Sequence, residues 1–281
     1  MSFFYWDYVM QQTENTPQDL MRTNYDNALL NWDVLLDIQT DLLFPFELQF
    51  FLGSEVWNNA EQVLDVGCGN GYYLTKLHTY FSDKKYTGID KSGELIRLAK
   101  ANALQGNIEF QCSDFFDYKS DKLFDAVLLR LTVQHMNGLE QMLFDAHRMT
   151  SGNSSMIIIE PDPGRAKNFP PTPLFWDTLD KIENASAQLN KNRGSIDQLG
   201  HNLRQAAGWE LRGEEQVIVP QTGPFTNSSL LQMFLLWIDI FETSNAFQYD
   251  FDSVREELST WARKETSYSQ LALRIYLLEK K

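Results

Sequence analysis

The chain has 281 residues, of which 43% are hydrophobic and 13% aromatic, enough for a packed core in one large domain or two small ones. Its formal net charge of −14, with no basic stripe to offset it, disfavours nucleic-acid binding, because Lys and Arg build most of that affinity. No apolar run reaches the roughly 18 residues that cross a bilayer, and Met1 to Met10 do not resemble a signal peptide. Cys68 and Cys112 lie outside any metal-binding spacing, so we expect a cytoplasmic globular protein without nucleic-acid or membrane partners.

Residues 1–60 are predicted to form a mostly helical segment ahead of the first clear strand. The aromatic residues Trp32, Phe44 and Trp57 are scattered through it, so it must pack on the body of the protein. A mobile lid over a ligand and a fixed helical cap predict the same pattern. We therefore expect a cap or lid over residues 1–60, followed by a main domain over residues 61–281.

The first strand leads into a glycine-rich turn. An aliphatic run from Val63 to Val66 contains Asp65, and Gly67, Gly69 and Gly71 follow at alternate positions before an amphipathic helix. Glycine reaches positive φ cheaply and leaves the backbone open to a ligand, so this pattern predicts a nucleotide-binding turn. A nicotinamide-type turn needs a further glycine where Tyr72 stands, which disfavours a nicotinamide oxidoreductase.

Strands and helices alternate after the turn, and a polar residue follows each strand. Asp90 ends the second strand about 20 residues after the glycines, a position where a carboxylate can bind a ribose diol. Considered without the glycine turn, Asp90 is as well interpreted as the N-cap of the next helix. In open α/β sheets ligands bind at the carboxyl ends of the strands. The side chains expected to face one crevice are therefore those of Asp65, Asp90, Asp114, Arg130 and Glu160.

The second half of the chain is predicted to complete the sheet and to carry helical insertions. A polar helical insertion is expected over about 165–195, followed by a helix from Ile196 and a sixth strand around 216–219. A further helical insertion is expected over about 226–264, and a closing strand over 270–278.

The stretch from Asp65 to Gly71 closely resembles the first motif of the class I S-adenosylmethionine-dependent methyltransferases of small-molecule type. The polar residues at the ends of the later strands occur in the same order as in that family, over about residues 60–162. The resemblance implies a Rossmann-like α/β fold, with a seven-stranded, mostly parallel sheet and helices on both faces. Its last strand enters antiparallel, and the N-terminal cap and helical insertions are added to it. The resemblance also implies S-adenosylmethionine as cofactor and S-adenosylhomocysteine as product.

The same resemblance implies a role for particular residues. Asp65, Gly67, Gly69 and Gly71 would hold the methionine end of the cofactor. Asp90, with Lys91 beside it, would take the ribose hydroxyls, and Ser113, Asp114 and Phe115 the adenine. Arg130 and Leu131 would lie next to the methionine moiety and the sulfonium.

The stretch from Arg130 to His135 is similar to the R-x-x-x-Q-H segments of small-molecule methyltransferases. His135 is equally well interpreted as a general base, as a wall of the cofactor site, or as a structural histidine. Were the acceptor an alcohol or a phenol, the candidate bases would be His135, Glu160 and Asp162. No Asp follows the fourth strand as a catechol-type magnesium site requires, so no metal is expected.

These observations predict a metal-independent methyltransferase that acts on an O, N or C nucleophile of a small molecule or a flexible peptide. Two alternatives stay open: an enzyme that uses the same cofactor for other chemistry, and a catalytically inactive partner subunit. Fold analogy does not set the substrate, and the oligomeric state does not follow from the sequence.

Overall fold

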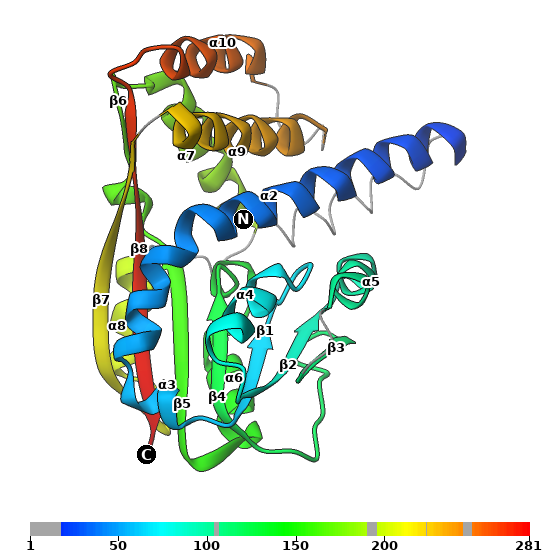
Figure 1. Cartoon of the computed structure of the whole chain (residues 1–281), viewed down its shortest axis with the longest axis vertical. Helices are drawn as coiled ribbons and strands as arrows, with labels where there is room; N and C mark the ends of the chain where they lie inside the picture. The colour runs from blue at the N-terminus through cyan, green and yellow to red at the C-terminus, as the bar shows by residue number, and fades with distance from the viewer. Residues whose placement is uncertain (1–17, 104–106, 190–195, 223, 244–248) are drawn as a thin grey trace. The chain divides into compact units, whose positions relative to one another are not determined.

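The computed structural model describes residues 18–103, 107–189, 196–222, 224–243 and 249–281 (Figure 1). Parts of the predicted cap and of the predicted insertions fall outside these ranges. Contacts group the chain into two compact units made of non-consecutive segments. Unit 1 comprises Met1–Leu42, Pro163–Lys191 and Ile218–Leu271, and unit 2 comprises Leu43–Asp162, Asn192–Val217 and Ala272–Lys281. The division into a cap and a cofactor-binding domain at residue 60 stays a prediction.

The sheet has the predicted Rossmann-like topology. Five strands pair in parallel in the order β3-β2-β1-β4-β5, as Figure 1 shows. Their bounds are β1 (Gln62–Val66), β2 (Lys85–Asp90), β3 (Ile108–Cys112), β4 (Phe124–Arg130) and β5 (Thr150–Pro161). The closing strand β8 (Tyr268–Lys280) runs antiparallel to β5, which confirms the predicted direction.

Two further strands pair with β8, which makes eight strands in the sheet instead of seven. One is β7 (Trp209–Thr222), the predicted sixth strand. The other is the short β6 (Lys167–Phe169), which pairs antiparallel with β8 inside the segment predicted to be helical. Three residues are too few for a recognisable alternation of apolar and polar side chains, so β6 leaves almost no signal in the sequence.

Helices cover both faces of the sheet in unit 2. Alternate strand residues such as Leu64, Val127 and Ile158 form one buried cluster with α6 (Leu139–Met149) and α8 (Ile196–Arg204). The opposite face is covered by α3 (Glu55–Asn59), α4 (Tyr72–Tyr80) and the final turns of α2 (Gln18–Gly53). Buried on both faces, β4 is an almost continuous apolar run, and residues 126–129 are 0% exposed.

Unit 1 is largely helical in its described part. It contains the first portion of α2, the 3₁₀ turn η3 (Pro163–Arg165), α7 (Pro173–Leu189), α9 (Pro224–Thr243) and α10 (Phe251–Ala262). Aromatic rings fill its core, with the centroids of Phe175 and Phe234 4.5 Å apart and both side chains fully buried. Among the residues described, no helix combines the length and the apolar character that crossing a membrane requires.

Candidate functional site

The glycine turn joins β1 to α4 at the carboxyl edge of the sheet. Gly67, Gly69 and Gly71 have φ values of 77°, 56° and 75°, a region that side-chain-bearing residues rarely adopt. A Cβ at Gly71 would lie 2.5 Å from Cζ of Phe110, and a Cβ at Gly67 would lie 2.6 Å from Oγ1 of Thr132. These two positions therefore require glycine both for backbone conformation and for close packing.

Asp90 at the end of β2 is tied to the turn by its side chain. The backbone N–H of Gly69 donates to Oδ2 of Asp90 at 3.0 Å, and that of Ser92 donates to Oδ1 at 2.8 Å. Burial raises the pKa of Asp90 to about 6, against the lowering effect of these two hydrogen bonds. The N-cap of α5 (Gly93–Asn102) is Ser92, whose Oγ accepts from Leu95 N, so the interpretation of Asp90 as N-cap is wrong.

Asp65 and Arg130 lie on the same face of neighbouring strands, and both are buried. Burial raises the pKa of Asp65 to about 7; the charge of Arg130 lowers it and that of Asp90 raises it further. Nε of Arg130 donates to both carboxylate oxygens of Glu47 at 3.0 Å, and its guanidinium lies 4.2 Å from the centroid of the Tyr73 ring. Nη2 of Arg130 is buried and has no hydrogen-bond partner.

The sequence prediction missed Glu47 and Tyr73. Glu47 is 0% exposed, although it belongs to the helix α2. Its only signal in the sequence is a single carboxylate within the apolar stretch from Leu42 to Phe51. Tyr73 is a helical aromatic residue of a kind that usually belongs to the core. Neither pattern indicates that these two residues contact Arg130 on β4.

The segment after β4 has a strained backbone and is held by Glu160. Leu131 adopts φ 54°, which places a non-glycine residue in the left-handed region. The backbone N–H groups of Thr132 and Val133 donate to Oε1 of Glu160 at 2.8 and 2.6 Å. Burial raises the pKa of Glu160 to about 7, although these hydrogen bonds lower it. His135 is half-buried at the end of the 3₁₀ turn η2 (Val133–His135), which follows directly.

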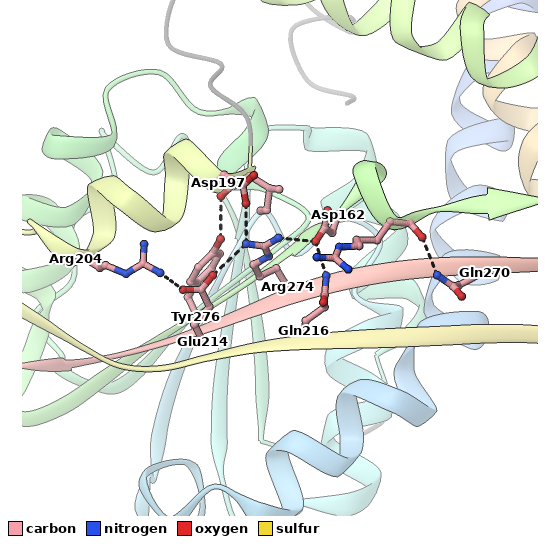
Figure 2. A network of polar contacts seen from close by, with 10 residues as sticks. Asp162, Asp197, Arg204, Glu214, Gln216, Gln270, Arg274 and Tyr276 are labelled. Carbon is pink, nitrogen blue, oxygen red and sulfur yellow. Dashed lines mark hydrogen bonds and ion pairs between the residues drawn. The ribbon is translucent and has the colours of Figure 1, made fainter.

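Asp162 lies in a separate ionic network. Oδ2 of Asp162 accepts from Nη2 of Arg274 at 2.7 Å and from Nε2 of Gln216 at 3.0 Å, as Figure 2 shows. Nη1 of Arg274 also donates to Asp197 at 2.9 Å and to Glu214 at 3.1 Å. This candidate base therefore helps to connect β5, β7, β8 and α8.

The residues predicted to bind adenine follow β3. Oγ of Ser113 donates to the carbonyl of Asp114 at 2.9 Å, and the exposed Asp114 carboxylate accepts from the N–H of Phe116 at 2.9 Å. Phe115 is buried in the core cluster. The carbonyl of Lys91, which is half-buried, accepts from Sγ of Cys112 at 3.5 Å. Both cysteines are free thiols, Cys112 exposed and Cys68 buried.

The structure brings the turn, Asp65, Asp90 and Arg130 together at the ends of β1, β2 and β4. The guanidinium of Arg130 pairs with the carboxylate of Glu47 and interacts with that of Asp65, which also feels the charge of Asp90. The three buried carboxylates give an excess of negative charge that suits a cationic ligand. Within the described residues, no group of His, Cys, Asp and Glu side chains has the arrangement of a metal site.

Comparison with known proteins decides the family. A family model described as a methyltransferase domain matches residues 58–214, more than half of the chain. The chain belongs to the class I S-adenosylmethionine-dependent methyltransferases. Two similar relatives are the malonyl-acyl-carrier-protein O-methyltransferases of Priestia megaterium and Acetivibrio thermocellus. They are 22% identical over 140 residues and 34% identical over 120 residues, which is 50% and 43% of this chain and 50% and 41% of theirs. The matched part thus spans half or less of these relatives.

Solved structures share the fold of this chain at low identity. A plantazolicin methyltransferase in complex with a monoazolic desmethyl analogue and S-adenosylhomocysteine is 16% identical, with a TM-score of 0.50 over 99% of this chain and 96% of its own. The (4+2)-cyclase SpnF is also 16% identical, with a TM-score of 0.51 over 83% of this chain and 78% of its own. The same fold thus serves proteins named for different reactions.

The residues at this site fit the family's cofactor, S-adenosylmethionine. That molecule carries two cationic centres, an ammonium and a sulfonium, together with a carboxylate and a ribose diol. Asp65 and Asp90 offer buried carboxylates, which a nearby cation favours in their charged form. The unpartnered Nη2 of Arg130 offers a donor suited to a carboxylate.

Proposed function

We propose that this protein transfers a methyl group from S-adenosylmethionine to an O, N or C nucleophile of a small molecule or a flexible peptide, without a metal ion. The observation that carries the proposal is the glycine turn, with positive φ at all three glycines, bracketed by two buried carboxylates, Asp65 and Asp90. Its place in a chain of this family fixes the reaction class that should be tested first. The free cysteines agree with a reducing compartment, so a cytoplasmic location is part of the proposal.

In this proposal, residues at different strand ends bind different parts of the cofactor. Asp65 and the backbone of Gly67, Gly69 and Gly71 hold the methionine end, and Arg130 binds its carboxylate. Asp90 accepts from the ribose hydroxyls with the lone pairs that Gly69 and Ser92 leave unused. The adenine lies beside Ser113 and Asp114, and the remaining predicted contacts are Lys91, Phe115 and Leu131. Because Phe115 is packed in the core, we assign it support of this segment instead of a freely exposed stacking face.

When bound, S-adenosylmethionine supplies a methyl group that its sulfonium already activates. The work left to the chain is to hold the acceptor in line with that methyl group and to keep water out. The left-handed backbone at Leu131 turns the chain sharply after β4, and so carries the segment up to His135 past the end of that strand.

A proton acceptor is needed only for some substrates. Glu160 and Asp162 are buried and make structural contacts within the protein. We propose His135, which is half-buried in the segment after β4, as the base for alcohol or phenol acceptors. A carboxylate acceptor is already ionised at neutral pH and needs no base. The names of the malonyl-acyl-carrier-protein O-methyltransferases make carboxylate oxygens the first acceptors to assay.

Calorimetric titration with S-adenosylhomocysteine tests the proposal directly. Micromolar binding corresponds to about −8 kcal/mol and is easily measured. Asp90→Ala alone is ambiguous, because Asp90 also holds Gly69 and Ser92. The variant should therefore be combined with a 2′-deoxyribose analogue of the ligand. If Asp90 binds the ribose, removing the hydroxyl should weaken binding to the wild type and have little further effect in Asp90→Ala.

The possible outcomes separate the competing functions. Absence of binding to the folded wild type would overturn the proposal and favour the inactive partner subunit. If the protein binds the ligand, mass spectrometry of acceptor reactions with S-adenosylmethionine should show products heavier by one CH₂ unit, because a methyl group replaces a proton. A cofactor-dependent product without that mass change would identify other chemistry on this fold.

A further inference from the structure

Glu160 is the penultimate residue of β5 and carries a buried carboxylate. Its Oε1 accepts from two consecutive backbone N–H groups, those of Thr132 and Val133. Its Oε2 is buried and has no hydrogen-bond partner among the residues that the structure describes. The residue is 2% exposed, and the oxygen Oε1 is already engaged by the two backbone N–H groups. These contacts do not suit a general base, which must reach the proton that it removes.

The segment held by Glu160 contacts the glycine turn. Oγ1 of Thr132 donates to the carbonyl of Arg130 at 2.9 Å, which fixes the orientation of the Thr132 side chain. That side chain lies so close to Gly67 that an added Cβ would come within 2.6 Å of Oγ1 and 2.8 Å of Cγ2. Glu160 thus holds Thr132 through its backbone, and Thr132 borders the first glycine of the turn through its side chain.

We propose that Glu160 is a positioning residue for cofactor binding, acting through Thr132 on the glycine turn, and that it is not the proton acceptor of the reaction. The inference rests on the proposed function, because the turn is there assigned to the methionine end of the cofactor. Oε1 accepts from both Thr132 and Val133, so a proton on Oε2 leaves these two hydrogen bonds in place. The positioning role therefore persists in both protonation states.

Two substitutions separate a positioning role from a base. Glu160→Gln keeps a carbonyl oxygen that can accept from Thr132 and Val133, but it cannot take up a proton. Glu160→Ala removes the acceptor and leaves the buried N–H of Thr132 and the part-buried N–H of Val133 without it. We expect Glu160→Gln to bind S-adenosylhomocysteine within roughly threefold of the wild type, and Glu160→Ala to bind it roughly 10- to 100-fold more weakly.

Turnover gives the second readout. With an accepted substrate, Glu160→Gln should keep kcat within roughly threefold and the same pH profile of kcat, because no proton passes through this residue. A base would give the opposite result, in which Glu160→Gln binds the ligand normally but loses kcat and one limb of the pH profile. That result would overturn the proposal even if Glu160→Ala failed to fold.

The route through Thr132 is tested by a double-mutant cycle. Thr132→Ser keeps the hydroxyl and removes Cγ2, one of the atoms closest to Gly67. If Glu160 acts through Thr132, the losses of S-adenosylhomocysteine affinity in Glu160→Ala and Thr132→Ser should not add in the double variant. Additive losses would contradict this route.

Amide hydrogen exchange distinguishes failure of this inference from failure of the proposed function. The N–H groups of Thr132 and Val133 should exchange faster in Glu160→Ala than in the wild type, with or without ligand. Unchanged exchange would show that Glu160 does not order the loop. A wild type that binds no S-adenosylhomocysteine would overturn the proposed function, and with it the cofactor role inferred for Glu160, whatever the exchange result.

Discussion

Glu47 and Arg130 are 83 positions apart in the sequence, and their side chains form a buried ion pair in which Nε lies 3.0 Å from both carboxylate oxygens. The exposed fractions of the two side chains are 0% and 7%. Glu47 precedes the region that matches the family, residues 58–214, whereas Arg130 lies within it. A helix outside the matched domain therefore supplies the charge partner of a candidate cofactor-binding residue.

We expect Glu47→Gln to destabilise the protein by about 3–5 kcal/mol, because it deprives a buried guanidinium of its ion-paired carboxylate. Urea denaturation followed by circular dichroism measures this change. The control is Glu94→Gln, which breaks an exposed pair with Arg97 and should cost no more than about 1 kcal/mol. Equal denaturation midpoints for Glu47→Gln and the wild type would contradict a structural role for the pair.

Gly71→Ala should lower both stability and affinity for S-adenosylhomocysteine. The added Cβ would meet the Phe110 ring, and φ 75° strains any residue with a side chain, so we expect a loss of about 1–3 kcal/mol in stability. Gly152→Ala is the matched control, since its Cβ would meet nothing within 4 Å and its φ is not in the positive region. Thermal unfolding and calorimetry measure the two effects; a Gly71→Ala variant that behaves like the control would refute the packing argument.

The buried acid Asp65 should make the stability of the ligand-free protein depend on pH. Its pKa is raised by burial from 3.8 to about 7, so the protonated form is favoured in the folded state. The stability that this residue contributes is complete below about pH 4 and is lost as the pH rises through about 7. Asp65→Asn mimics the protonated form, so its stability relative to the wild type should increase as the pH rises from about 4 to about 7. We expect up to about 4 kcal/mol, at about 1.4 kcal/mol per pKa unit. Thermal unfolding over this range tests the prediction, and a difference between the two proteins that does not vary with pH would contradict it.

Arg274 should stabilise unit 2 mainly through Asp162. The Asp162 side chain is 4% exposed and that of Asp197 is 79% exposed, although both accept from the same guanidinium (Figure 2). Arg274→Ala leaves a buried carboxylate without its charge partner, and we expect a loss of about 3–5 kcal/mol in stability. Asp197→Asn removes only a solvent-screened contact and should cost at most about 1 kcal/mol. Similar losses in the two variants, measured by urea denaturation, would show that burial does not rank these contacts.

The part of the fold that the sequence predicts is the part encoded by short-range patterns. The run into Asp65, the spaced glycines and the apolar strand over residues 124–129 each determine local structure within about ten residues. Because the carboxyl ends of parallel strands lie at the same edge of the sheet, the proximity of Asp65, Asp90 and Arg130 can be predicted without knowledge of their contacts. The direction of β8 came from the family resemblance, and the pairing with β5 confirms it.

The rest depends on contacts over long sequence separations. Nothing near Glu47 indicates that it pairs with Arg130, and nothing near Asp162 indicates that Arg274 pairs with it from 112 positions away. The helix α2 continues through Pro45, where the sequence alone favours an end or a kink. The contact between Thr132 and Gly67 likewise joins two turns that share no pattern. Packing thus decides which of the candidate acids are available to a ligand.

The two thiols differ enough to make this protein convenient for spectroscopy. Cys112 is exposed just after the Phe110 that packs on Gly71, whereas Cys68 is buried within the turn and its pKa is raised well above the usual range by burial. Because the thiolate is the reactive form, a maleimide dye should attach to Cys112 much faster than to Cys68. A fluorophore placed there reports on the end of β3 from a single position, without any engineered cysteine. Its emission on addition of S-adenosylhomocysteine gives an optical assay of the candidate adenine subsite.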